Sequence, residues 1–150
     1  MIIRKAKVQD VPTIHLLISS YAELDRMLFR SMADIYENLQ IFKVAEDAGT
    51  VVGCCALRVV WSNLAEIKSL AVNQNYFGKG TGKALVHSCL EDARQLGIKK
   101  VFTLTLVPEF FEKTGFCRAE KNAFPMKVWS DCAQCPKQDQ CDETALMVEL

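Results

Sequence analysis

Three glycines at alternate positions, Gly78, Gly80 and Gly82, lie where a β-rich run ends and an amphipathic helix begins. Glycine lets successive backbone N–H groups converge without obstruction by a Cβ atom, and the N-terminus of a helix carries about half a positive charge. A strand–loop–helix unit of this kind predicts a site where a phosphate or pyrophosphate is bound mainly by backbone groups. The alternative is a turn that binds no ligand.

Other phosphate-binding loops fit this segment less well. A Walker A loop needs Ser or Thr directly after its Gly-Lys pair, whereas Gly82-Lys83 is followed by Ala84. A dinucleotide-binding fingerprint should open a parallel βαβ unit near the N-terminus. Here the glycines lie in mid-chain, after strands that we expect to pair antiparallel.

Hydrophobic periodicity and turn residues predict a mixed α/β domain that spans residues 1–150. We expect strands over 2–8, 41–46, 51–61, 64–72, 101–106, from 116, over 124–129 and over 145–150. Helices are expected to start at the N-caps Asp10 and Ser31, after the glycine loop, and at Pro108. The helix after the glycine loop should bury Leu85, Cys89, Ala93 and Leu96 and end at Gly97.

Composition excludes several classes of protein. The 18 basic and 18 acidic residues cancel, so no overall field favours nucleic acid or an anionic membrane as a partner. No apolar run reaches the roughly 20 residues of a membrane span, and the N-terminus lacks the pattern of a signal peptide. The odd number of cysteines, seven, favours a reducing compartment, and we expect a cytoplasmic protein. A homodimer is one option for its assembly.

Two motifs resemble those of a known family. Leu70-Ala71-Val72, with the segment from Gly78 to Leu85, resembles the acetyl-CoA motif of the GNAT N-acetyltransferases, and Phe110 to Phe116 is similar to their second motif, which ends in Gly-Phe. The resemblance covers nearly the whole chain. It implies a mostly antiparallel, splayed central sheet flanked by helices, with the pantetheine arm of acetyl-CoA between two diverging strands.

The resemblance also implies the residues that contact acetyl-CoA: Leu70, Ala71, Val72, Phe77, Gly78, Lys79, Gly80, Thr81, Gly82, Lys83, Phe110 and Phe111. Phe77 departs from the family, which usually has Arg or Gln before the first glycine. For Phe110 and Phe111, packing along the pantetheine arm and packing in the core remain alternatives.

Residues 27–31, 65–72 and 145–150 resemble, more specifically, the acetyltransferase domain of N-acetylglutamate synthases in its short stand-alone form. The implied reaction transfers acetyl from CoA to the α-amine of L-glutamate, the first step of arginine biosynthesis. Acetylation of another small amine or of a protein N-terminus remains an alternative, as does a non-catalytic acyl-CoA sensor.

Glu66 resembles the general base of the family, acting directly or through a water. The alternative is an exposed strand carboxylate paired with Lys68. A backbone N–H near Val72 is a candidate for polarising the thioester carbonyl. Phe111 stands where many relatives carry a tyrosine that acts as general acid, so the CoA thiolate must leave without that phenol.

The substrate carboxylates require cations. The resemblance places Arg30 and the backbone of Leu28 at glutamate contacts, and Arg58 and Lys68 follow from their positions on central strands. Surface residues without a ligand are the alternative. Two further cations of the family are replaced, at Asn63 and near Cys141-Asp142, which leaves room for another acidic amino acid.

Cys132, Cys135 and Cys141 form a C-x2-C-x5-C set, in which two thiolates can face one ion, and a structural zinc is therefore one hypothesis. Buried thiols, or a disulfide formed on oxidation, are the alternatives. Cys54, Cys55 and Cys89 fall in apolar patterns and are expected in the core.

Overall fold

The computed structural model describes residues 1–23, 30–120 and 143–150. Within these ranges, seven strands form one sheet: β1 (Ile2–Lys5), β2 (Phe42–Asp47), β3 (Thr50–Trp61), β4 (Leu64–Val72), β5 (Lys100–Thr105), β6 (Cys117–Arg118) and β7 (Thr144–Glu149). The helices are α1 (Val11–Glu23), α2 (Met32–Glu37), α3 (Thr81–Gln95) and α4 (Pro108–Lys113), with short 3-10 turns η1 (Val8–Asp10), η2 (Leu39–Ile41) and η3 (Gln74–Tyr76).

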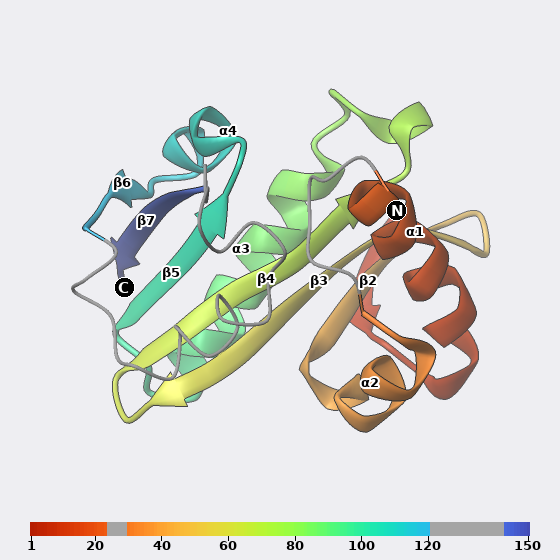
Figure 1. Cartoon of the computed structure of the whole chain (residues 1–150), viewed down its shortest axis with the longest axis horizontal. Coiled ribbons are helices and arrows are strands. Elements are labelled where there is room, and N and C mark those ends of the chain that lie inside the picture. Colours follow the sequence, from red (N-terminus) through yellow and green to blue (C-terminus); the bar gives the residue numbers. More distant parts are fainter. Residues whose placement is uncertain (24–29, 121–142) are drawn as a thin grey trace.

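The sheet order is β1-β2-β3-β4-β5-β7-β6, and every neighbouring pair is antiparallel except β4–β5. Helix α3 covers one face of the sheet, and α1 with α2 covers the other (Figure 1). This arrangement confirms the predicted mixed, mostly antiparallel sheet flanked by helices. No helix among the described residues is long and apolar enough to span a bilayer.

The parallel strands β4 and β5 pair only at their beginnings. The register joins Leu64 to Lys100, Ala65 to Val101 and Glu66 to Phe102, and it ends there although both strands continue (Figure 1). One residue further along β4, the Thr103 hydroxyl donates to the Ile67 carbonyl at 2.9 Å, so a side chain replaces the backbone ladder. The sheet is therefore splayed from Glu66 onwards.

A β-bulge lies in the splayed part of β4. Ala56 of β3 pairs with Lys68 and Cys54 with Ala71, so Ser69 and Leu70 together oppose one residue. Ser69 has φ 55, a left-handed conformation in which a residue other than glycine is strained. The extra residue reverses the alternation of faces: Ile67 packs with the α3 core, whereas Ala71 packs with the α1 and α2 core.

The core confirms most of the buried positions predicted for α3 but not Leu96. Leu85, Cys89 and Ala93 are fully buried, whereas Leu96 is 63% exposed. After α3, Gly97 adopts φ 83, and the Ile98 N–H donates to the Ala93 carbonyl at 2.9 Å, as in a Schellman motif. This reversal carries Ile98 into the core in place of Leu96.

The N-terminal segment also differs from the expectation. The first strand ends at Lys5 because η1 begins at Val8. Asp10 does precede α1, but its carboxylate accepts the Lys7 N–H and two donors of Arg4. The predicted strand over 124–129 lies outside the described residues, and the one predicted from Phe116 is reduced to the two residues of β6.

Candidate functional site

The glycine loop ends at a helix terminus that no side chain caps. Gly78 and Gly80 have φ 75 and 82, a conformation that strains any other L-residue, and Gly80 occupies the N-cap position of α3. The first helical bond runs from the Ala84 N–H to the Gly80 carbonyl at 2.9 Å. The preceding N–H groups of the first turn therefore point out of the helix with the positive end of its dipole, which suits a pyrophosphate.

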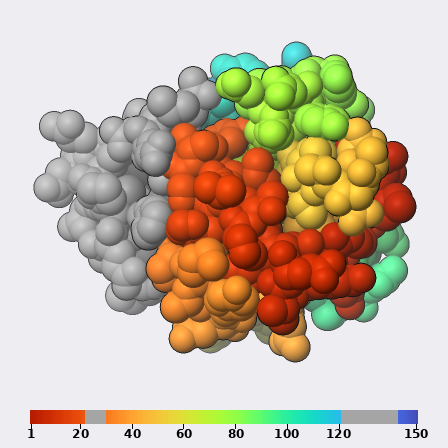
Figure 2. Space-filling model, turned by 90° about the vertical axis from the view of Figure 1, so that its right-hand side faces the viewer, coloured from red at the N-terminus to blue at the C-terminus, as the bar shows by residue number. Residues whose placement is uncertain are grey.

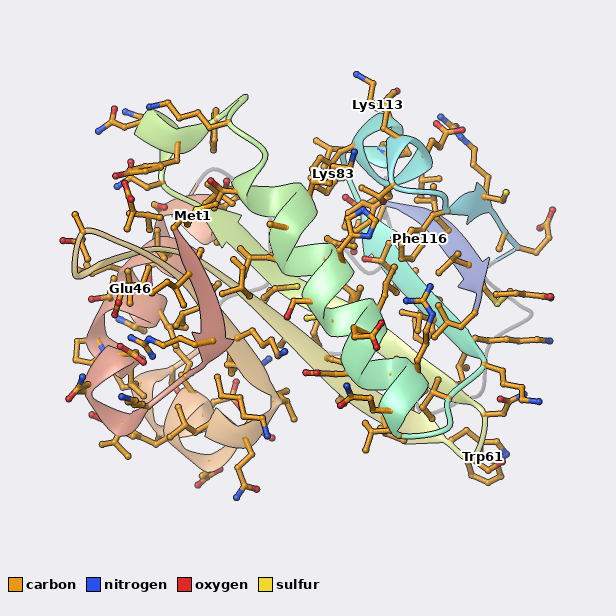
Figure 3. The ribbon with its side chains drawn as sticks, turned by 180° about the vertical axis from the view of Figure 1, so that it is seen from behind. Met1, Glu46, Trp61, Lys83, Lys113 and Phe116 are labelled. Atoms are coloured by element: carbon orange, nitrogen blue, oxygen red, sulfur yellow. The ribbon has the colours of Figure 1, made fainter. Side chains whose placement is uncertain are left out.

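The N-terminal end of α3 is packed on one side against α4 and on another side against the sheet. A Cβ at Gly82 would lie 3.2 Å from the Phe110 ring, so α4 packs directly on the first turn of α3 (Figure 3). A Cβ at Gly53 would lie 3.0 Å from Leu85 and 3.4 Å from Thr81, so this glycine lets α3 approach the sheet. Sequence reasoning missed Gly53, although a glycine inside a strand pattern is a known signal of close approach.

The loop between β4 and α3 is anchored to the β2–β3 turn. The Tyr76 hydroxyl donates to Asp47 at 2.8 Å, and this hydrogen bond raises the pKa of Tyr76. The Lys79 ammonium lies 5.2 Å from the centre of the Tyr76 ring, and Phe77 is 54% exposed. In the space-filling view, the loop stands at the upper rim of the molecule beside that turn (Figure 2).

Beyond Glu66, no strand among residues 1–23, 30–120 and 143–150 pairs with the edge of β4 that would face β5. The Asn73 N–H bonds to the Val52 carbonyl of β3 at 2.8 Å, so the peptide groups of Val72 point the other way, toward β5. There the Val72 N–H donates to the Tyr21 hydroxyl at 3.2 Å, and this hydroxyl lies 3.1 Å from the Val72 carbonyl, to which it donates. The N–H that we expected to polarise a carbonyl therefore already has a partner, which sequence reasoning missed.

Glu66 lies at the last residue pair before the strands separate and is only 5% exposed. Arg58, opposite it on β3, donates from Nη2 to Glu66 Oε1 at 2.8 Å. The alternative expectation of an exposed carboxylate is wrong in its exposure, because Glu66 is buried, and its cross-strand neighbour is Arg58. The structure thus brings together two residues that the sequence proposed for different roles.

Arg30 is buried, with 9% of its surface exposed. Its Nε and Nη2 donate to the two carboxylate oxygens of Asp34 at 2.7 and 3.2 Å, and its Nη1 donates to the Ser69 hydroxyl at 3.3 Å. The guanidinium also lies 5.2 Å from the centre of the Phe42 ring. Arg30 therefore contacts the bulge of β4 at Ser69, the residue directly after Lys68. Leu28 lies outside the described residues.

Phe111 is a core residue. Its ring is 3% exposed and packs edge-on against Phe110 and Phe116, with centroid separations of 5.0 and 5.3 Å. Phe110 is only partly buried, and its ring lies against Gly82 in the first turn of α3. Of the two alternatives for Phe111, core packing is the one that the structure has.

The cysteines proposed as zinc ligands, Cys132, Cys135 and Cys141, lie outside the described residues. Within 1–23, 30–120 and 143–150, no three His, Cys, Asp or Glu side chains gather to hold a metal. Cys54, Cys55 and Cys89 are fully buried, as expected. Burial raises the pKa of Cys54 to about 12, so this thiol remains protonated at neutral pH.

The chain has relatives along its whole length. The model of the Acetyltransferase (GNAT) family matches residues 10–116. An uncharacterized N-acetyltransferase of Chlorobaculum tepidum is 40% identical over 148 residues, which are 99% of this chain and 96% of that protein. An amino-acid acetyltransferase of Mycobacterium tuberculosis is 39% identical over 133 residues, 87% of this chain and 76% of that protein. The amino-acid acetyltransferases of Neisseria meningitidis are longer, and the chain covers 29% of their length at 32% identity.

Solved structures agree with these relatives. A Mycobacterium tuberculosis protein in complex with CoA and the ligand NLQ superposes with a TM-score of 0.87 at 32% identity, over 100% of this chain and 99% of that one. The N-acetylglutamate synthase of Neisseria gonorrhoeae, complexed with coenzyme A and N-acetyl-glutamate, superposes with a TM-score of 0.91 at 28% identity, over 99% of this chain and 35% of that one. With its splayed sheet and its uncapped glycine-loop helix, the chain belongs to the GNAT family of acetyltransferases.

Proposed function

We propose that this enzyme transfers acetyl from acetyl-CoA to the α-amine of an acidic amino acid, with L-glutamate as the first candidate and the first step of arginine biosynthesis as its place. The relatives named amino-acid acetyltransferase support the amino-acid substrate. The neighbouring structure with N-acetyl-glutamate supports glutamate in particular.

The observation that carries the proposal is the position of Glu66 on β4. The same strand that presents this carboxylate, where β4 and β5 part, leads into the phosphate-binding end of α3. A pantetheine arm that follows the free edge of β4 from the loop would bring its thioester toward Glu66. Backbone amides Thr81, Gly82 and Lys83 would hold the pyrophosphate at the other end.

Glu66 acts as the base in this proposal. The amine nitrogen attacks the thioester carbonyl, Glu66 takes the proton that the nitrogen loses, directly or through a water, and the C–S bond breaks to release the CoA thiolate. Because Phe111 is a buried hydrocarbon, it supplies no proton to that thiolate. A thiolate leaves readily at neutral pH, so the step needs no phenol at this position.

The charges around Glu66 favour an acidic substrate. Arg58 lies directly opposite Glu66, Lys68 follows two residues later on the same face of β4, and Arg30 touches Ser69. Three cations thus lie on the face of the sheet that carries α1 and α2. The carboxylates of Glu66 and Asp34 lie on the same face, where they pair with Arg58 and Arg30. We assign Arg30, with the backbone of Leu28, to a carboxylate of the substrate, and Arg58 and Lys68 to the surrounding field.

Turnover of acetyl-CoA with a panel of amines tests the function. Glutamate should be acetylated fastest, aspartate and glutamine more slowly, and spermidine or an N-terminal peptide not at all. A preference for spermidine or the peptide would refute the acidic substrate and leave only an acetyltransferase. Tight binding of acetyl-CoA without turnover of any amine would instead favour an acyl-CoA sensor.

The glycine loop offers a matched pair of variants for the co-substrate. Gly80 and Gly97 stand at opposite ends of α3, both have φ above 80, and a Cβ at either would meet nothing within 4 Å. Gly80→Ala and Gly97→Ala should therefore cost similar stability, roughly 1–2 kcal/mol. Only Gly80→Ala should weaken CoA binding, measured by calorimetry, and equal affinities would remove the loop from the site.

The remaining parts of the proposal have simple tests. A structural zinc at Cys132, Cys135 and Cys141 would appear in metal analysis of the purified protein. A homodimer would appear in sedimentation, and fractionation of cells would test the cytoplasmic location.

A further inference from the structure

The hydroxyl of Tyr21 bonds to the edge of β4 that has separated from β5, and it reaches this edge from the face of the sheet that carries α1 and α2. Tyr21 lies in the last turns of α1, and its ring packs against the α1 and α2 core. It reaches 51 residues along the sequence to bond both polar groups of Val72, at 3.1 and 3.2 Å. This side chain thus supplies one donor and one acceptor to Val72, a strand residue that does not pair with β5.

The same two groups of Val72 are what an extended ligand would use. An extended chain that adds to a free strand edge pairs its amide N–H and C=O with backbone groups of that edge. The pantetheine arm contains two amides and no charge, so it can pair in this way. The Val72 N–H carries one proton and can make only one good hydrogen bond, so an amide of the arm and the Tyr21 hydroxyl compete for it.

We propose that Tyr21 is a positioning residue for acyl-CoA, which holds the Val72 peptide groups in the free enzyme and releases them to an amide of the pantetheine arm. The proposal rests on acyl-CoA as the co-substrate. In the free protein the hydroxyl keeps the edge of β4 satisfied and in place. In the complex the phenol turns away, and water or the ligand takes its hydrogen bonds.

Tyr21→Phe tests this exchange, because it removes only the hydroxyl. The free variant should lose stability, and CoA should bind about 3- to 10-fold more tightly, since the free state alone loses hydrogen bonds. In saturating CoA the melting temperatures of variant and wild type should coincide, because the tighter binding offsets the lost stability. Adenosine 3′,5′-bisphosphate, which lacks the pantetheine arm, should bind both proteins equally. Tyr36→Phe on α2, where Tyr36 is 44% exposed, is the control and should change none of these values.

Two outcomes would overturn the proposal. Weaker or unchanged CoA binding by Tyr21→Phe would mean that the hydroxyl keeps its bonds in the complex or has no part in binding, and a stability difference that persists in saturating CoA would mean the same. Hydrogen exchange of the Val72 amide gives a second measurement: exchange should be faster in the free variant, and CoA should restore protection. Failure of wild type to bind CoA at all would refute the proposed function instead, so the two failures are distinguishable.

Discussion

Two arginine–carboxylate pairs in this protein look alike but lie in different surroundings. Asp10 and Glu66 are both 5% exposed, and their closest contacts with Arg4 and Arg58 are 2.7 and 2.8 Å. Asp10 accepts two donors of Arg4 and the Lys7 N–H at the beginning of the chain, where η1 and α1 are joined. Glu66 accepts from Arg58 Nη2 at the point where two strands part. Burial and pairing are therefore the same for the structural carboxylate Asp10 and for Glu66, which we propose as the base, and position in the sheet is what separates them.

The sharpest way to break this comparison is to neutralise each carboxylate in turn. Glu66→Gln should lower turnover at neutral pH by roughly 10²-fold or more, the scale of general base catalysis, with CoA binding retained. The deficit should shrink at higher pH, because more of the substrate amine is then already neutral. Steady-state kinetics with glutamate measures it. Near-normal turnover at pH 7 would give Glu66 the same structural role as Asp10.

Asp10→Asn is the matched substitution at the other pair. It should leave turnover unchanged and lower the free energy of unfolding by about 2 kcal/mol, because a buried charge-assisted pair is lost. This loss of stability is smaller than the loss expected when a buried charge is left without a partner, because Arg4 also pairs with Glu46 at 3.0 Å. Urea unfolding provides the value, and a variant as stable as wild type would contradict our account of this pair.

A third pair, Arg30 with Asp34, sharpens the comparison because both structural and binding roles are proposed for its arginine. Arg30→Ala should raise the KM for glutamate more than tenfold while CoA affinity changes little. Arg30→Lys should recover only part of the loss, because an ammonium cannot reproduce two-pronged geometry. Asp34→Asn keeps the guanidinium and should affect the KM less; an equal effect would make Arg30 structural.

Glutamine then identifies the carboxylate that Arg30 binds. If Arg30 holds the side-chain carboxylate, wild type should prefer glutamate to glutamine strongly and Arg30→Ala should not. An unchanged preference in the variant would assign Arg30 to the α-carboxylate instead. The ratio of kcat/KM for the two substrates is the measurement.

The smallest expected effect is the pH dependence that Asp10 confers. The hydrogen bonds from Arg4 lower the pKa of Asp10 below its ordinary value of about 3.9. The unfolded chain therefore binds the proton first, so the stabilisation is complete above that value and is lost as the pH falls through the lower folded pKa. The free energies of unfolding of wild type and Asp10→Asn, measured as a function of pH, should converge at low pH. A difference that stays constant with pH would contradict this.

Local signals in the sequence predicted the elements well. The helix predicted to start at Pro108 does start there, and the antiparallel strands, the glycine loop and the N-cap at Ser31 follow from turn chemistry and spacing. The prediction failed where a residue answers to distant contacts. Leu96 fits the helical stripe, but the chain reversal at Gly97 brings Ile98 into the core instead. Asp10 has the chemistry of a cap, but its carboxylate accepts hydrogen bonds from Arg4 and from the Lys7 N–H.

For the site, the sequence alone determined the residue types and their order: a β4 carboxylate, alternate glycines and a helix, because these interactions are local or use backbone. Only the tertiary structure decided which groups meet. The pairing of Glu66 with Arg58 depends on the β3–β4 register, and the contacts of Tyr21 with Val72 and Arg30 with Ser69 cross 51 and 39 residues of sequence. Such contacts depend on how strands diverge and where a bulge falls, which composition and periodicity along one segment do not encode.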